Sequence, residues 1–444
     1  MKLWDKGYSI DKLIENFTVG KDRELDLQLA KFDVLGSMAH ITMLETIDLL
    51  TKKELEKLLP ELKSIYQTIE QGKFEIEKDE EDVHSQIESL LTQKLGDIGK
   101  KIHSGRSRND QVLLDLKLYT RNEIQELVDL TKDLFSELLV QADKYKEYAM
   151  PGYTHLQVAM PSSFGLWFSA WAESLTDDLL LLQTAYKITN QNPLGSAAGY
   201  GSSFPLNRQM TTDLLGFDKM NINVIYAQMG RGKMEKTVSF ALSSIAATLS
   251  KMSFDVCMFM CQNFGFITLP QELTTGSSIM PHKKNPDVFE LIRAHCNKIQ
   301  SIPAQITLMT NNLPSGYFRD YQILKEVFLP AFDELKECIK IATYAISKVN
   351  VKANILDDDK YKYVFSVESV NRMVMQGIPF RDAYKEVGMQ IQKGEFKPEG
   401  SVEYTHVGST GNLCLSQIRE NFDKTVSEYH FEKVESAYKK LLNN

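Results

Sequence analysis

Apolar residues recur at helical spacing along most of the middle of the chain. The stretch 106–150 contains neither Gly nor Pro, and Leu127, Leu134 and Leu138 return to one side of a predicted helix. A helix of about forty residues would be ~60 Å long. Similar helical runs cover 162–192, 233–264 and 287–302, and another straddles Pro330. No alternating pattern predicts a central sheet, so the predicted fold class is all-α, with an elongated helical bundle at its centre.

The apolar surface of these helices exceeds what the bundle of one chain can cover. The run Phe254–Met260 is apolar except at Asp255, which is typical of a helix that is buried on every side. Such a helix fits the core of a large monomer or an interface, and the length of the bundle helices favours an oligomer. At 444 residues the chain also exceeds one compact core, so two or three domains are expected.

The composition is that of a folded protein, with 43% hydrophobic and 25% charged residues. Charged residues interrupt every apolar run, so no segment is predicted to cross a membrane, and the early acids of the N-terminus argue against a signal peptide. We therefore expect a cytoplasmic protein. The net charge of −8 disfavours nucleic acid and anionic membranes as partners.

The five cysteines are odd in number and lie mostly in apolar helical context, which argues against a disulfide framework. Cys257 and Cys261 are one helical turn apart and could suggest a metal pair, but no second pair of His or Cys accompanies them. We interpret both as core residues and predict no metal site.

The connections between the helical runs carry the candidate chemistry. In the first of them, residues 100–110, four basic residues precede the first acid, and Arg106 and Arg108 suit the binding of carboxylate or phosphate. The alternative is a solvated loop in which Asn109 or Asp110 caps the helix that follows.

A second connection holds His155 between Pro151–Gly152 and Pro161. Imidazole titrates in the range that suits acid–base chemistry, although a single histidine can equally be structural. The glycine-rich connection 192–205 fits neither the dinucleotide-binding pattern nor a P-loop, so nucleotide binding by those devices is disfavoured.

The last connection, 274–287, combines the hydroxyl of Ser277 with Lys283, Lys284 and Asn285. A mobile hydroxyl beside ammonium groups suits removal of a proton next to a carboxylate, because the cations hold the carboxylate and stabilise the carbanion-like charge. The alternative is that the two lysines are only a solvated surface.

Three of these segments resemble the motifs of one enzyme superfamily. They are SGRSRNDQV (104–112), PGYTHLQ (151–157) and TGSSIMPHKKNPD (275–287). The third is similar to the signature GSSxMPxKxNP of the fumarase/aspartase superfamily, and the three together resemble the argininosuccinate lyase family within it. The segments EDVHS (81–85), NPLGS (192–196), LPSGY (313–317) and GIPFRDA (377–383) also fit, so the resemblance spans nearly the whole chain.

The resemblance implies three helical domains, 1–105, 106–354 and 355–444, and a central long-helix bundle that assembles into a tetrameric superbundle. It also implies a homotetramer in which each active site is shared between three subunits. The implied reaction is the reversible elimination of argininosuccinate, a small-molecule substrate, to arginine and fumarate, without a metal or organic cofactor.

The resemblance further assigns roles to single residues. Ser277 takes the Cβ proton and His155 protonates the departing guanidine, although the opposite assignment of acid and base remains open. Glu290 orients His155, while Lys283 and Asn285 hold the succinyl carboxylates and stabilise the intermediate. Positions that match substrate-binding residues are Asn109, Thr154, Tyr317, Gln322 and Lys325, with Arg106 and Arg108 beside them.

The sequence departs from the family's pattern at several positions. His282 stands where Gln is usual and makes its loop similar to that of adenylosuccinate lyase, which is the first alternative function. The segments 223–233 and 317–326 lack acids that the family usually carries, and Asp22 stands where a substrate-contacting Ser is expected. These changes leave open how the arginine end is held and whether an acylated substrate is preferred. A structural role like that of lens crystallins is disfavoured, because every catalytic position is retained.

Overall fold

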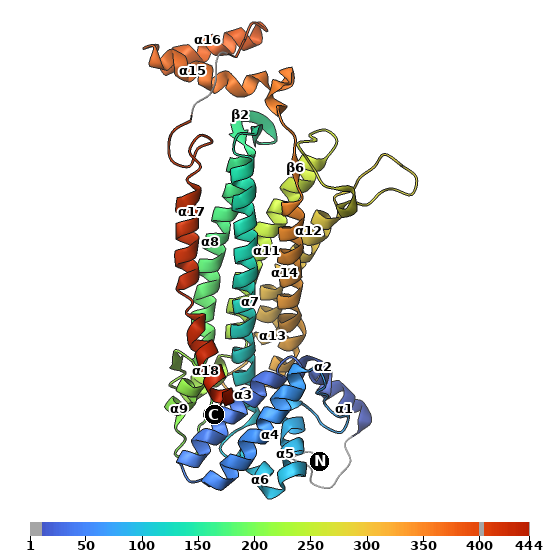
Figure 1. Ribbon diagram of the computed structural model, residues 1–444, viewed down its shortest axis with the longest axis vertical. Helices are drawn as coiled ribbons and strands as arrows, with labels where there is room; N and C mark the ends of the chain where they lie inside the picture. Colours follow the sequence, from blue (N-terminus) through green and yellow to red (C-terminus); the bar gives the residue numbers. More distant parts are fainter. Residues whose placement is uncertain (1–10, 399–403, 444) are drawn as a thin grey trace.

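The computed structural model describes residues 11–398 and 404–443. The first ten residues, which carry part of the prediction about a signal peptide, lie outside these ranges. The molecule is elongated, with long helices running side by side between a group of short helices at one end and two helices at the other (Figure 1). Within the described residues no helix is both long enough and apolar enough to span a membrane.

The long helices predicted from the sequence are confirmed. They are α7 (Arg108–Lys144), α8 (Phe164–Thr189), α11 (Lys233–Met260), α12 (Asp287–Ile299) with α13 (Ile302–Thr310), and α14 (Leu324–Ser347). Pro303 lies in the first turn of α13, where a proline costs no hydrogen bond, and Pro330 lies inside α14. The all-α fold class is also confirmed.

Helix α7 begins where its sequence provides a cap. The Ser107 side chain accepts from the backbone of α7's first turn, and the Asp110 side chain accepts in return from the Ser107 backbone N–H. More than half of the helix is buried between α8, α14 and α3 (Ala30–Thr46). This cap therefore also sets the position of the residues in the first turn of α7.

The helices of the N-terminal end surround α3. Besides α3 they are α1 (Lys12–Val19), α2 (Asp22–Asp26), α4 (Lys52–Glu70), α5 (Val83–Leu95), α6 (Asp97–Lys100) and η1 (Lys101–His103). Two helices of the middle of the chain, α9 (Arg208–Leu214) and α10 (Val224–Met229), lie at the same end.

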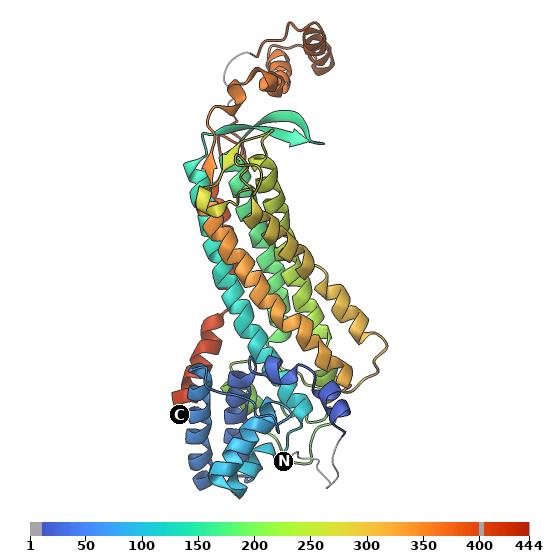
Figure 2. The ribbon, with the colours of Figure 1, turned by 90° about the vertical axis from the view of Figure 1, so that its right-hand side faces the viewer.

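The strands are short and form pairs only. The pair β1 (Ala149–Thr154) and β2 (Gln157–Ser163) is an antiparallel hairpin that projects from the far end of the bundle (Figure 2). The other pairs are β3 (Gln191–Asn192) with β4 (Lys219–Met220) and β5 (Ile267–Thr268) with β6 (Asn350–Val351). The remaining turns include η2 (Gln271–Leu273), η3 (Arg319–Ile323), η4 (Ile355–Asp357) and η5 (Asp359–Phe365).

The C-terminal part of the chain lies in two places. Helices α15 (Ser366–Met375) and α16 (Phe380–Gln392) share a small core of their own. Helix α17 (Leu415–Ser427) instead returns along α8, and α18 (Phe431–Asn443) reaches α3 and α9. The division into 1–105, 106–354 and 355–444 stays a prediction.

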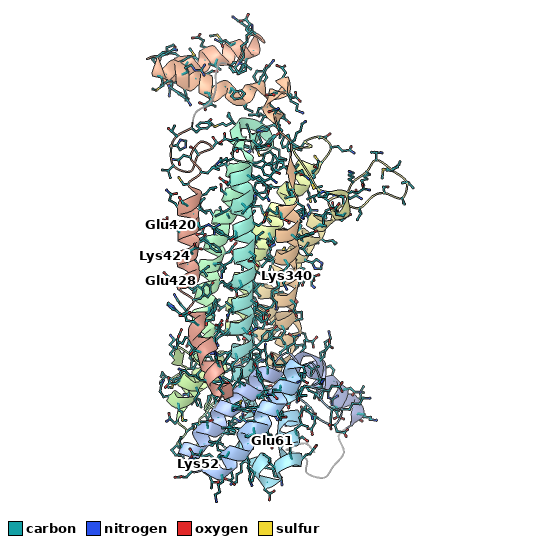
Figure 3. The ribbon with its side chains drawn as sticks, in the orientation of Figure 1. Lys52, Glu61, Lys340, Glu420, Lys424 and Glu428 are labelled. Atoms are coloured by element: carbon teal, nitrogen blue, oxygen red, sulfur yellow. The ribbon has the colours of Figure 1, made fainter. Side chains whose placement is uncertain are left out.

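Helix α17 is held to the bundle by its apolar side. The Phe422 ring stacks on Phe135 of α7 with 3.7 Å between ring centroids. Glu420 and Lys424 of α17 and Glu428, which follows its last residue, are exposed along the outer edge of the molecule (Figure 3). The amphipathic pattern of this segment therefore explains why it docks although a long loop precedes it.

Candidate active site

A cavity of about 240 Å³ lies where the N-terminal helices meet the bundle, and we call it the junction cavity. Five of the predicted substrate-binding residues line it: Arg108, Asn109, Tyr317, Gln322 and Lys325. The other lining residues are Asp22, Asp26, Glu81, Asp82, His84, Val112, Arg231 and Arg319. Segments that are far apart in the sequence thus converge on one polar cavity.

The first turn of α7 supplies one wall of the junction cavity. Arg108 is held in place, because its guanidinium donates to Asp82 Oδ2 at 2.9 Å and to Ser85 Oγ at 2.7 Å. The side chain of Asn109 makes no hydrogen bond to any residue of 11–398 or 404–443. The Asn109 amide is therefore available to a ligand, whereas Arg108 positions this wall.

The segment around η3 supplies the opposite wall. Gln322 Nε2 donates to the backbone carbonyls of Thr18 and Val19, at 2.8 and 3.2 Å. Arg319 donates to the Thr18 carbonyl and to Glu81 Oε1, at 2.8 and 3.0 Å. These bonds tie the N-terminal helices to the start of α14.

The ammonium group of Lys325 is one of the buried charges that line the junction cavity. It lies 2.7 Å from Asp22 Oδ1 and 2.6 Å from Asp26 Oδ1. Burial by itself would lower the pKa of Lys325, but the charges of Asp26 and Asp22 outweigh burial and raise it. Lys325 is therefore charged throughout the physiological range.

His84 reaches the junction cavity from a buried network. Its Nδ1 lies 2.8 Å from Asp33 Oδ1 and 3.5 Å from Asp115 Oδ2. Burial would lower the pKa of His84, but the charge of Asp33 and the bond to it raise the pKa. The raised pKa favours the protonated imidazole, which can donate a proton at Nε2.

Arg106, which was predicted to bind substrate, does not line the junction cavity. It is buried beside α3, where Nη1 donates to Ser37 Oγ at 2.9 Å. Its charge acts on Asp33 and Asp115 instead. The sequence shows its charge but not the direction of its side chain.

Eight of the lining residues were not predicted to be site residues, namely Asp22, Asp26, Glu81, Asp82, His84, Val112, Arg231 and Arg319. Most of them lie in segments that were noted for other reasons, such as 81–85, 223–233 and 317–326. The pairing of Arg319 with Glu81 was not visible, because the two residues are far apart in the chain.

The predicted catalytic loop extends from the bundle between η2 and α12 (Figure 1). Ser277 Oγ accepts from the backbone N–H groups of Ile279 and Met280, at 3.3 and 3.1 Å. Lys283 is exposed, and the backbone N–H of Asn285 closes the loop by donating to the Thr275 carbonyl at 2.9 Å. The hydroxyl of Ser277 is thus already surrounded by donors.

The β1–β2 hairpin presents Thr154 and His155 at its exposed turn. His155 and Leu156 form the two-residue turn of the hairpin, and both have positive φ, 54° and 57°, as a type I′ turn requires. Positive φ is costly for residues other than glycine, and such strain often accompanies a functional site. His155 makes no hydrogen bond within the described ranges.

The predicted site residues thus form three groups in one chain. The junction cavity holds one group, and neither the hairpin residues nor the loop residues line it. Glu290, in the first turn of α12, is exposed. Within the described part of one chain, no hydrogen bond joins Ser277, His155 and Glu290.

Comparison with known proteins identifies relatives along the whole chain. Residues 6–301 match a protein family described as Lyase. The chain is 66% identical over 442 residues to an argininosuccinate lyase of Parabacteroides distasonis, covering 100% of this chain and 99% of that protein. It is 40% identical over 386 residues to an argininosuccinate lyase of Thermotoga neapolitana, covering 87% of this chain and 97% of that protein.

Solved structures share the same fold. An EDDS lyase in complex with formate matches with a TM-score of 0.75 at 20% identity, over 98% of this chain and 95% of that chain. A class II fumarase from Schistosoma mansoni matches with a TM-score of 0.71 at 15% identity, over 95% and 94% of the two chains.

Proposed function

Since the chain belongs to the argininosuccinate lyase family, we propose that it cleaves argininosuccinate reversibly into L-arginine and fumarate. The observation that carries this proposal is the convergence of Asn109, Tyr317, Gln322 and Lys325 on one polar cavity. A substrate with carboxylate groups and cationic nitrogen groups needs a cavity lined by charged side chains of both signs, and the junction cavity has both.

We propose that Ser277 takes the Cβ proton. Its Oγ accepts from two backbone N–H groups, and donors in this arrangement stabilise a deprotonated oxygen. This contact supports Ser277 as the base, with His155 as the acid that protonates the leaving guanidine. Lys283 and Asn285 would hold the succinyl carboxylates, and Glu290 would orient His155.

We further propose that a complete site requires several subunits of a homotetramer. The three groups of site residues lie apart in one chain, so another copy must bring them together. The long helices also carry exposed apolar side chains that another copy could cover, for example Phe240 and Phe254 of α11, which are 54% and 52% exposed. A cytoplasmic location stays a prediction.

The activity is tested by following fumarate absorbance after adding argininosuccinate to the protein. Release of fumarate is expected, and a Ser277→Ala variant should lose nearly all of it. Turnover of adenylosuccinate with none of argininosuccinate would overturn the proposal, and the absence of any turnover would favour a structural role.

The shared site is tested by mixing two inactive variants, Ser277→Ala and Asn109→Ala. If each site takes these residues from different subunits, hybrids formed by unfolding and refolding the mixture contain some intact sites. Partial recovery of activity is therefore expected. Failure to recover, with tetramers formed, would contradict the shared site while leaving the activity itself untouched.

A further inference from the structure

Lys325, Asp22 and Asp26 line the junction cavity as one group, and this group carries more negative than positive charge. Lys325 is the single cation that Asp22 and Asp26 share, at 2.7 and 2.6 Å. One positive and two negative charges leave a net charge of −1 in this group. Lys325 is 5% exposed and Asp26 is 2% exposed, whereas the side chain of Asp22 keeps 16% of its surface exposed.

Asp22 retains a free carboxylate oxygen. Lys325 occupies Oδ1, and Oδ2 accepts no hydrogen bond from any residue in the described part of the chain. Asp26 differs, because its Oδ2 lies 3.5 Å from the backbone nitrogen of Val83. Asp22 is therefore the acid of this pair that can still bind a ligand.

Among the described residues, Lys325 is the one cation that forms an ion pair with Asp22. Burial raises the pKa of Asp22 to about 6, the charges of Asp26 and Asp82 add to this effect, and only Lys325 opposes it. A bound cation would reverse this balance and stabilise the ionised carboxylate.

The other cations of the junction cavity are occupied elsewhere. Arg108 is bound to Asp82, and Arg319 to Glu81. The imidazole of His84 is paired with Asp33 at 2.8 Å. Arg231 Nε is bound to Glu235 Oε1 at 3.0 Å, in a fully buried pair. None of these arginines forms an ion pair with Asp22 within the described residues, so the missing positive charge is left for a ligand.

We propose that Asp22 binds the α-ammonium group of the arginine half of the substrate and so restricts the enzyme to substrates whose α-amino group is not acylated. This inference rests on the proposed lyase function. It assigns a specificity role to one residue of the junction cavity.

The position of the reacting bond decides which cationic nitrogen reaches Asp22. The guanidine nitrogen carries the succinyl group and must face Ser277 and His155, and neither residue lines the junction cavity. Those residues must therefore act on a part of the substrate that lies outside the cavity. The other end of the substrate, with its α-amino group, then occupies the cavity that Asp22 lines.

Acylation would remove the features that Asp22 recognises. It replaces an ammonium group with three donors and a full charge by a neutral amide with one donor. Asp22 would then keep Lys325 as its one paired cation, and the acyl group would have to fit beside Lys325 and Asp26, which are 5% and 2% exposed. Both effects disfavour an acylated ligand.

The test compares L-arginine with Nα-acetyl-L-arginine as inhibitors of fumarate release. The wild-type protein should bind L-arginine about 30-fold more tightly, or better, as expected for loss of a hydrogen bond to a charged group. Asp22→Asn should bring the ratio of the two inhibition constants close to one. The matched control is Asp320→Asn, which removes an exposed carboxylate of η3 that does not line the cavity and should keep the wild-type ratio.

A wild-type ratio near one would overturn the inference, and so would an Asp22→Asn variant that keeps the full ratio. The wild-type comparison stands even if the variant does not fold. Failure of the proposed function is distinguishable, because the wild-type protein would then release no fumarate from argininosuccinate at all. In that case binding of the two arginine compounds can still be measured by calorimetry.

Discussion

The same isosteric substitution is expected to have opposite consequences at two neighbouring buried aspartates, Asp33 and Asp115. Burial by itself would raise the pKa of both carboxyl groups. At Asp33 the charge of His84, its hydrogen bond and the charge of Arg106 outweigh burial and lower the pKa. At Asp115 the charge of Asp33 adds to burial, and the pKa is raised well above its ordinary value. Asp33 is therefore the carboxyl group that ionises first, and Asp115 keeps its proton to higher pH.

The contacts of each group set the size of the effect. Asp33→Asn removes the anion that faces His84 and Arg106, and leaving buried charges unpaired costs ~3–5 kcal/mol. Asp115→Asn replaces a protonated acid by an amide that still donates, and the change in a neutral hydrogen bond is worth only ~1 kcal/mol. The two variants should therefore differ in the free energy of unfolding by about 3 kcal/mol.

The difference between wild type and Asp33→Asn should depend on pH. The contribution of Asp33 is present above its unfolded pKa and is lost as the pH falls through its lower folded value. The contribution of His84 is complete below 6.5 and is lost as the pH rises through its raised folded value. The difference should thus be largest between the two unfolded pKa values, 3.8 and 6.5, and should narrow as the pH rises above 6.5.

Urea unfolding followed by circular dichroism, at pH 5 to 9 and equal protein concentration, measures these differences. The reasoning is refuted if Asp115→Asn destabilises the protein as much as Asp33→Asn. Asp33, His84 and Asp115 also have the spacing of a metal site. A bound divalent ion would keep both carboxylates ionised, so the wild-type measurement is repeated with EDTA, and a loss of stability there would also refute the protonated state of Asp115.

Three further changes test local parts of the structure. Ser107→Ala removes the cap of α7 and should lower the free energy of unfolding by ~1 kcal/mol. It should also lower kcat/KM several-fold, because Asn109 lies in the capped turn, whereas Ser107→Thr should retain most of the stability and the activity. Phe422→Ala removes the ring that stacks on Phe135 and should lower the free energy of unfolding by ~3–5 kcal/mol. Backbone hydrogen exchange in α17 should become faster, and unchanged exchange there would contradict this docking. Burial lowers the pKa of Lys117 from 10.5 to about 7, so stability should rise with pH between these values, and Lys117→Met should lack that rise in urea unfolding.

The long helices could be predicted from the sequence because helical periodicity is a local property. Along α7 and α11, apolar residues recur three or four positions apart, and no Gly or Pro interrupts them. The same is true of the cap at Ser107. The catalytic loop around Ser277 could be proposed because its residue types lie together in the chain.

The place of the last helices in the fold could not be predicted in the same way. Helices α16 and α17 are both amphipathic, yet α16 packs on α15 while α17 packs on the bundle. An apolar stripe shows that a helix must be covered, but not by what. Only the packing of the whole chain decides which surface is still free when each helix docks.

The junction cavity is the clearest case of a feature that tertiary structure alone decided. Lys325 and Asp26, 299 residues apart, form a buried ion pair with Asp22 beside them. The sequence determined that these charges exist and that the chain is helical. The tertiary structure decided that Arg106 is buried away from the cavity, that Asp22 keeps a free oxygen, and that Ser277 and His155 lie elsewhere. The physical reason is that burial and charge pairing depend on distances in space, which local sequence patterns do not encode.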